Sequence, residues 1–162
     1  MGPAKNCSLP YEDEIEPPRP VFVYGSLLSD KVFAKVMQSA FGPTYVVPRR
    51  IAGVVLEGYK RVCVRNAPYP AIIPKDGSHV EGGIYFIQSH DETRLLDTFE
   101  SDMYRRETID ARVVEENRVV EADVYVFDKD VLLLDDTPWS FEEFEKNHMN
   151  NWIESPRFDG GF

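Results

Sequence analysis

Cysteine and basic residues are both scarce in this chain. Its 162 residues include only two cysteines, Cys7 and Cys63, which is too few for a disulfide framework. Lys and Arg together number 18 against 28 Asp and Glu, so the net charge is −10. No basic stripe is present that could neutralise phosphate groups, and the composition therefore argues against a nucleic-acid partner.

Long hydrophobic runs are missing as well. No apolar stretch approaches the ~20 residues that a membrane-spanning helix needs, and the N-terminus has no signal-peptide core. These absences predict a protein without a membrane partner, in a reducing, cytoplasmic setting. The three histidines, His79, His90 and His148, are scattered without metal-ligand spacing, so no metal site and no cofactor are expected.

What is present favours one folded domain. Hydrophobic residues make up 43% of the chain, and this length can bury a sizeable core without disulfides. Residues 1–20 are rich in Asp, Glu and Pro and predict a disordered leader. Residues 155–162 predict a flexible tail, which leaves an α+β domain over residues 21–154.

Apolar patterning and turn residues divide this domain into elements. In the first half the pattern predicts a strand over 21–24, a helix over 30–40 capped by Asp30 and stopped at Gly42-Pro43, and β-rich segments over 44–57, 60–64 and 69–74. Asp76-Gly77 predicts a hairpin turn that leads into a strand over 80–88.

The second half contains two sequences of capping-box form. The first, Ser89 to Glu92, predicts the start of a helix that carries Glu100, and the second, Ser140 to Glu143, predicts a helix that reaches about Trp152. Between them lie two predicted strands, over 107–114 and 119–127, with a turn at Glu116-Asn117.

The loop after the first predicted strand is a candidate binding element. A strand that breaks at Gly25 can aim successive backbone N–H groups into one concavity, which suits a carboxylate or a carbonyl oxygen. The alternative is an ordinary strand-to-helix turn capped by Ser26 or Ser29. The segment Tyr24–Leu28 also lacks the second glycine of the Gly-x-Ser-x-Gly nucleophile elbow.

Glu100 is the candidate acid. It follows Leu96 by four residues and Phe99 by one, so on a helix it borders the apolar stripe. Arg105 and Arg106 follow closely and offer a structural explanation by ion pairing. If the side chain instead lies in an apolar pocket, loss of water raises the pKa of the carboxyl group toward the range that serves proton transfer.

Four segments occur in a characteristic order: 21–27 with its Tyr-Gly-Ser loop, 69–74 followed by 80–82, 96–100 followed by Tyr104 and an arginine, and 139–144. In this order they resemble the gamma-glutamylcyclotransferase-like family, particularly its plant and fungal avirulence-induced branch. The resemblance covers about residues 21–153. It implies a small mixed β-barrel-like sheet with flanking helices and a cavity beside the Tyr-Gly-Ser loop.

The resemblance also implies an activity. Enzymes of this family release 5-oxoproline from gamma-glutamyl compounds without a cofactor, so the expected partner is a small gamma-glutamyl amine or amino acid. Glu100 would be the general acid and base. The implied substrate-binding residues are Tyr24, Gly25, Ser26, Leu27, Leu28, Tyr104 and Tyr125.

The sequence departs from the family at one point. The family usually has glycine directly after the glutamate, whereas here Ser101 follows, and then Asp102. Ser101 is expected to narrow the pocket mouth, and Asp102 to raise the pKa of Glu100. Two other functions therefore stay open: a non-catalytic member that binds a metabolite or a protein, and an enzyme for a different acylated amine. The sequence also leaves open whether the protein is a homodimer.

Overall fold

The computed structural model describes residues 16–150. In chain order its strands and helices are β1 (Val21–Val23), α2 (Asp30–Phe41), β2 (Arg50–Val64), β3 (Pro70–Tyr85), α3 (His90–Glu100), β4 (Tyr104–Val113), β5 (Arg118–Phe127), β6 (Leu134–Asp135) and α4 (Phe141–Asn147). The short 3-10 helices are η2 (Ser26–Leu28), η3 (Ser101–Met103) and η4 (Val131–Leu133).

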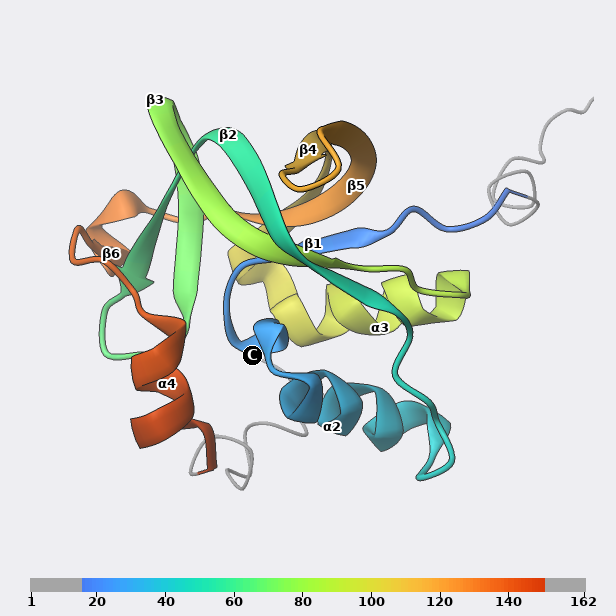
Figure 1. Ribbon diagram of the computed structural model, residues 1–162. Helices are drawn as coiled ribbons and strands as arrows, with labels where there is room; N and C mark the ends of the chain where they lie inside the picture. Colours follow the sequence, from blue (N-terminus) through green and yellow to red (C-terminus); the bar gives the residue numbers. More distant parts are fainter. Residues whose placement is uncertain (1–15, 151–162) are drawn as a thin grey trace, which may run out of the picture.

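Five of the strands close into a barrel (Figure 1). β1 lies between β3, to which it is antiparallel, and β5, to which it is parallel. β5 pairs with β4, β4 with β2, and β2 with β3, which completes the ring. β6 adds to β2 outside the ring. The predicted α+β architecture, a small mixed β-barrel-like sheet with flanking helices, is confirmed.

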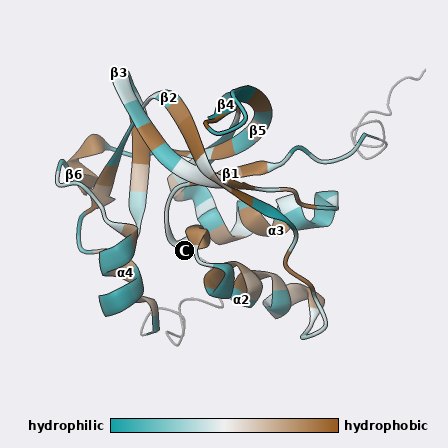
Figure 2. Cartoon of the chain, in the orientation of Figure 1, coloured by the Kyte–Doolittle hydropathy of each residue, from teal (hydrophilic) through white to brown (hydrophobic). Residues whose placement is uncertain are grey.

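Alternate residues of the strands face two apolar layers, as the two-residue period of a strand requires. One layer fills the barrel and draws on all five strands, for example Phe22, Leu56, Ile84, Ala111 and Val124. β1 is hydrophobic throughout (Figure 2), because its other face is buried too.

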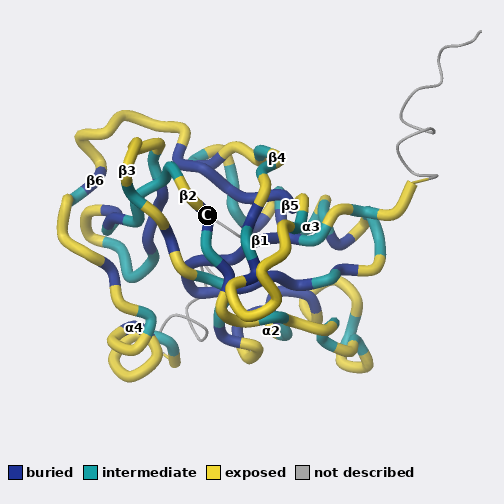
Figure 3. The backbone as a smooth tube through the Cα atoms, turned by 45° about the horizontal axis from the view of Figure 1, so that its top comes forward, coloured by how far each residue is buried: buried dark blue, intermediate teal, exposed yellow. Residues whose placement is uncertain are grey.

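The second layer lies between the barrel and the helices. Phe33 and Met37 of α2, Leu96 of α3 and Phe144 of α4 pack there against strand residues such as Tyr85. Buried residues gather in the barrel strands, whereas most of α4 is exposed (Figure 3). The helices therefore cover one side of the barrel, and α2 and α3 lie next to each other there (Figure 1).

The helix starts agree with the sequence patterns, with one correction. The capping box predicted at Ser89 and Glu92 is present at the start of α3. The side chain of Ser140 likewise caps α4 by accepting a bond from Glu143 N. α2 is capped by Ser29 and not by Asp30, because the Ser29 hydroxyl accepts a bond from Val32 N and Asp30 is already the first helical residue.

Three element predictions in the strands and the last helix are wrong. Asp76-Gly77 makes no hairpin, because β3 runs through it: Tyr59 of β2 pairs with Pro74 and Glu57 with His79, so the intervening residues of β3 form a bulge. Residues 44–49 are not a strand, and β2 instead continues through 58–59. The last helix is not continuous: α4 ends at Asn147, because His148 leaves helical backbone angles. Residues 149–150 are helical again, and Trp152 lies outside the described residues.

The chain ahead of β1 contacts the barrel over its described part. Arg19 Nε lies 2.7 Å from Asp123 Oδ1, and the Pro20 carbonyl accepts a 2.8 Å bond from Asp123 N. The remainder of the predicted leader and the predicted tail over 155–162 lie outside the described residues. Within residues 16–150, no helix is long and apolar enough to cross a membrane.

Candidate active site

The Tyr-Gly-Ser loop leaves β1 at the edge of a narrow cavity. After Gly25 the chain turns into η2, where Leu28 N donates to Gly25 O at 2.9 Å and Ser29 N to Ser26 O at 3.1 Å. Among the described residues, no acceptor takes the backbone N–H groups of Gly25, Ser26 or Leu27. The loop is therefore a source of three uncommitted donors, as a nest for an anion or a carbonyl oxygen requires.

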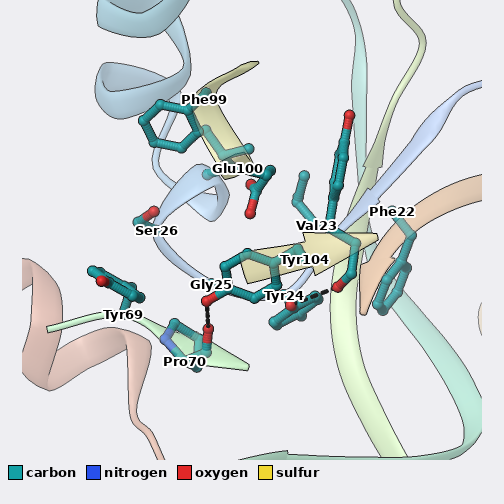
Figure 4. A pocket seen from close by; sticks show the side chains of 12 residues that line it. Phe22, Val23, Tyr24, Gly25, Ser26, Tyr69, Pro70, Phe99, Glu100 and Tyr104 are labelled. Carbon is teal, nitrogen blue, oxygen red and sulfur yellow. Dashed lines mark hydrogen bonds between the residues drawn. The ribbon is translucent and has the colours of Figure 1, made fainter. Parts of the chain in front are cut away.

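Glu100 ends α3 beside this loop. Its side chain points into the cavity between Ser26 and Tyr104 (Figure 4). Burial away from water and, to a smaller extent, the negative charge of Asp97 together raise the pKa of Glu100 to about 8. A carboxyl group with such a pKa can accept and return a proton near neutral pH.

The ion-pair explanation for Glu100 is wrong. Arg105 binds Glu107 and Asp128, and Arg106 binds Asp97 and Asp123. No hydrogen bond or ion pair joins Glu100 to another side chain within residues 16–150. The acid is therefore held by its place at the end of α3 and by packing, and its carboxylate is available to a ligand.

Half of the residues that line the cavity are aromatic. The cavity has a volume of about 40 Å³, and its lining residues are Phe22, Val23, Tyr24, Gly25, Ser26, Leu27, Tyr69, Pro70, Phe99, Glu100, Tyr104 and Tyr125. An apolar wall with few polar groups is typical of small-molecule sites.

The tyrosine hydroxyl groups of the wall are held by fixed hydrogen bonds. Tyr24 donates to Tyr125 O at 2.7 Å, and Tyr104 donates to Pro70 O at 2.8 Å (Figure 4). Tyr125 donates to Asp97 Oδ1 at 2.7 Å. Burial raises the pKa of all three hydroxyl groups above the usual value for tyrosine. Neutral, fixed tyrosines give the cavity a rigid wall.

The structure brings together all but one of the residues that the sequence indicated. Leu28 is the exception: it does not line the cavity, and its N–H group is bonded within the turn. The prediction that its N–H group faces the site is therefore wrong.

Sequence reasoning missed six residues. Five line the cavity, namely Phe22, Val23, Tyr69, Pro70 and Phe99. Two of these, Val23 and Phe99, stand directly beside a predicted site residue in the chain, which is a usable signal. The sixth is Asp97, whose carboxylate accepts the Tyr125 hydroxyl and influences the pKa of Glu100. Its spacing of three residues from Glu100 on one helix is the signal that could have indicated it.

Ser101 and Asp102 do not have the effects expected of them. Ser101 lies outside the cavity lining. It adopts φ 64° and ψ −168°, a backbone region that favours glycine, so its effect is on the backbone and not on the width of the pocket. Asp102 faces Lys129, with its carboxylate 3.5 Å from Nζ, and the charge that raises the pKa of Glu100 is that of Asp97.

Within the described residues, no group of three or more His, Cys, Asp and Glu side chains is arranged to hold a metal ion. The polar groups of the cavity include Glu100, the Ser26 hydroxyl, the N–H groups of the loop and the tyrosine hydroxyl oxygens.

The fold and this cavity define a class of protein. The family model for gamma-glutamyl cyclotransferase, AIG2-like, matches residues 21–146. The chain therefore belongs to that family, and the family predicted from the sequence is confirmed.

Individual relatives support the assignment. AIG2-like protein D of Arabidopsis thaliana is 30% identical over 140 residues, which cover 83% of this chain and 84% of that protein. A solution structure of an Arabidopsis thaliana protein is 28% identical, with a TM-score of 0.62 over 86% of this chain and 79% of that one. A structure named gamma-glutamyl cyclotransferase has the same fold, with a TM-score of 0.50 at 15% identity over 70% of this chain and 68% of that one.

Proposed function

We propose that this protein releases 5-oxoproline from a small gamma-glutamyl amine or amino acid. The observation that carries the proposal is the position of Glu100, a carboxyl group with a pKa of about 8 in the same cavity as three uncommitted backbone donors. Family membership supports the same reaction class. The narrow cavity favours a small substrate over a protein-linked side chain.

The reaction begins with proton removal. The α-amino group of the substrate is protonated near neutral pH and cannot attack its own γ-carbonyl carbon until it loses a proton. Glu100 takes that proton, and the amino nitrogen then forms a bond to the γ-carbonyl carbon, which closes a five-membered ring and leaves negative charge on the carbonyl oxygen.

The ring is released when the original amide bond breaks. Glu100 returns its proton to the departing nitrogen as the C–N bond cleaves. Glu100 also transfers a second proton from the attacking nitrogen to the departing nitrogen, so the amine leaves as an ammonium ion. Glu100 is then an unprotonated carboxylate again. The products are 5-oxoproline and the free amine.

The loop supplies the electrostatic part of this mechanism. The N–H groups of Gly25, Ser26 and Leu27 would donate to the substrate oxygen on which negative charge develops. Because nucleophile and carbonyl belong to one molecule, the cavity has only to hold the substrate folded back on itself. Such positioning is worth up to ~7–11 kcal/mol in favourable cases.

The direct test is an assay for 5-oxoproline over a panel of gamma-glutamyl amines and amino acids. Wild type is compared with Glu100→Gln, which keeps the shape of the side chain and removes its acid–base chemistry. Glu121→Gln is a matched control because Glu121 is exposed on β5. We expect product from wild type and the control and a loss of at least 100-fold for Glu100→Gln, the usual order for a general acid–base group.

Three outcomes would contradict the proposal. Equal turnover by wild type and Glu100→Gln would remove Glu100 from the mechanism. Absence of product across the panel, together with ligand-induced thermal shifts, would instead indicate a binding protein that uses the same cavity. Product from another acylated amine, but not from gamma-glutamyl compounds, would reassign the substrate class.

A further inference from the structure

Asp97 and Glu100 lie three residues apart on α3, close to each other on the helix surface. Glu100 lines the apolar cavity, whereas Asp97 lines a separate polar hollow whose other walls include Arg19, Arg106 and Asp123. The mechanism proposed above uses Glu100 alone and leaves Asp97 without a role.

Two neighbouring residues hold the Asp97 carboxylate in place. Arg106 contacts both of its oxygens, with Nε 2.9 Å from Oδ1 and Nη2 3.3 Å from Oδ2. The Tyr125 hydroxyl donates to Oδ1 at 2.7 Å. Arg106 and Tyr125 are direct partners across β4 and β5, so one point of the sheet contacts the carboxylate from two strands.

The other end of Arg106 is anchored as well. Its Nη1 lies 3.2 Å from Oδ2 of Asp123, a buried residue whose Oδ1 also accepts bonds from Arg19 and Thr108. Asp123 therefore holds in place the guanidinium group that forms the ion pair with Asp97. The network runs from the chain ahead of β1 to the last turn of α3.

Tyr125 links this network to the cavity. Its side chain is part of the cavity lining, and its hydroxyl group reaches Asp97 in the polar hollow. A change at Asp97 therefore reaches the wall that the substrate would contact.

We propose that Asp97 is a positioning residue for Glu100: through Tyr125 and Arg106 it ties the last turn of α3 to β4 and β5, and it keeps a fixed negative charge beside the acid of the cavity. This inference rests on the proposed function, since it assigns the residue that tunes the same proton transfer.

The charges around Glu100 support the same role for Asp97. Apart from burial, the charge of Asp97 is the influence that raises the pKa of Glu100. The other titratable groups of the cavity are tyrosines from each packed element: Tyr24 after β1, Tyr69 ahead of β3, Tyr104 on β4 and Tyr125 on β5. Arg106, the cation of the network, binds Asp97 and Asp123. Removing the negative charge of Asp97 therefore favours the ionised form of Glu100.

The test is the titration of the Glu100 carboxyl group, followed by NMR in wild type and Asp97→Asn. The asparagine keeps an oxygen that can accept the Tyr125 hydroxyl, so it removes the charge with little change in shape. We expect Glu100 to titrate at lower pH in Asp97→Asn, and the acidic limb of kcat/KM to move the same way, because that limb reports the free enzyme's base. Asp102→Asn is the matched control, since Asp102 is exposed and faces Lys129.

Arg106→Gln gives a second test, in which the pKa of Glu100 is expected to shift in the opposite direction. Loss of the guanidinium leaves Asp97 unneutralised, so Glu100 is expected to titrate at higher pH. A general loss of structure would not move the two variants in opposite directions. Arg106→Gln also serves if Asp97→Asn fails to fold.

The inference is overturned if the change in Asp97→Asn is no larger than in Asp102→Asn, or if Arg106→Gln moves the titration downward. The NMR titration does not depend on turnover. If the titration of Glu100 shifts in Asp97→Asn but no 5-oxoproline forms, the proposed function is rejected and the role of Asp97 stands. If 5-oxoproline forms but the titration does not shift, the proposed function stands and the role of Asp97 is rejected.

Discussion

The ring of Pro70 packs against Gly25 so closely that a side chain does not fit between them. A Cβ atom on Gly25 would lie 2.8 Å from Pro70 Cγ and 2.9 Å from Cδ, closer than nonbonded carbon atoms approach. The close approach brings the start of β3 against the Tyr-Gly-Ser loop. The absence of a side chain at position 25 is thus a condition for the cavity.

Gly25→Ala is expected to lower both stability and activity. The added methyl group must push the loop or Pro70 aside, at a cost of ~1–3 kcal/mol, as is typical for overpacking. The shift would also misdirect the N–H groups that are proposed to hold the substrate. Urea unfolding and the 5-oxoproline assay measure the two effects.

A compensating variant serves as the control. In Gly25→Ala with Pro70→Ala the ring is gone, so the double variant should recover part of the activity lost in Gly25→Ala. Additive losses in the double variant would show that the Pro70 ring is not the reason for glycine at this position.

Ser101→Gly should stabilise the protein. Ser101 holds φ 64° and ψ −168°, and a non-glycine residue in this backbone region costs about 1–3 kcal/mol. Its hydroxyl accepts a 3.3 Å bond from Met103 N, which offsets part of the strain. We therefore expect a net gain of about 1 kcal/mol, seen as a rise in Tm.

The control for Ser101→Gly is Ser101→Ala. Alanine keeps the backbone strain and loses the hydroxyl, so its Tm should fall below that of wild type. An increase in Tm for alanine similar to that for glycine would contradict the role assigned to the backbone.

The pH dependence of stability should reveal Glu100 even without an assay. The pKa of Glu100 is about 8 in the folded protein and about 4.3 in an unfolded chain. Between these values the folded protein keeps a proton that the unfolded chain releases, so stability falls as pH rises. The stability that Glu100 contributes is fully present below pH ~4.3, its pKa in the unfolded chain. It is lost as the pH rises through the pKa of Glu100 in the folded protein.

Glu100→Gln removes this dependence. The free energy of unfolding of the variant relative to wild type should therefore increase from about pH 5 to about pH 8, by up to ~1.4 kcal/mol per pH unit, and level off above that. Urea unfolding of both proteins over this range is the measurement. Parallel stability curves would mean that Glu100 titrates as an ordinary exposed glutamate.

Tyr104→Phe should reduce activity more than it reduces stability. It removes the 2.8 Å bond to Pro70 O, worth about 1 kcal/mol in stability, and frees the strand segment beside Gly25. If the displaced cavity wall loses ~1.4 kcal/mol of transition-state stabilisation, kcat/KM falls roughly tenfold. Tyr59→Phe is the control, because the Tyr59 hydroxyl bonds Glu107 away from the cavity; equal losses in both variants would contradict the prediction.

Much of this fold could be predicted from local patterns. The Ser89–Glu92 capping box marks the start of α3, because two side chain–backbone bonds close within four residues. Val21–Val23 is a short apolar run between Pro20 and the loop, and it forms a buried strand. Both signals depend only on neighbours in the chain.

Other features depend on partners far along the chain and were not predictable. Asp76-Gly77 has the composition of a hairpin turn, yet pairing with β2 holds it as a bulge within β3. Arg106 was expected near Glu100, but the register of β4 on β5 places it against Asp97 and Asp123. Which acid an arginine meets is decided by register, and register is not visible in one sequence.

The place of β1 between β3 and β5 has a consequence for how the protein matures. A ribosome makes Val21 long before its two sheet neighbours, Tyr85 and Asp123. The loop that follows β1 therefore lacks its neighbouring walls until β3 and β5 have been made, since contacts across such separations form late. A nascent chain that stops short of β5 would lack Tyr125, and with it one wall of the cavity.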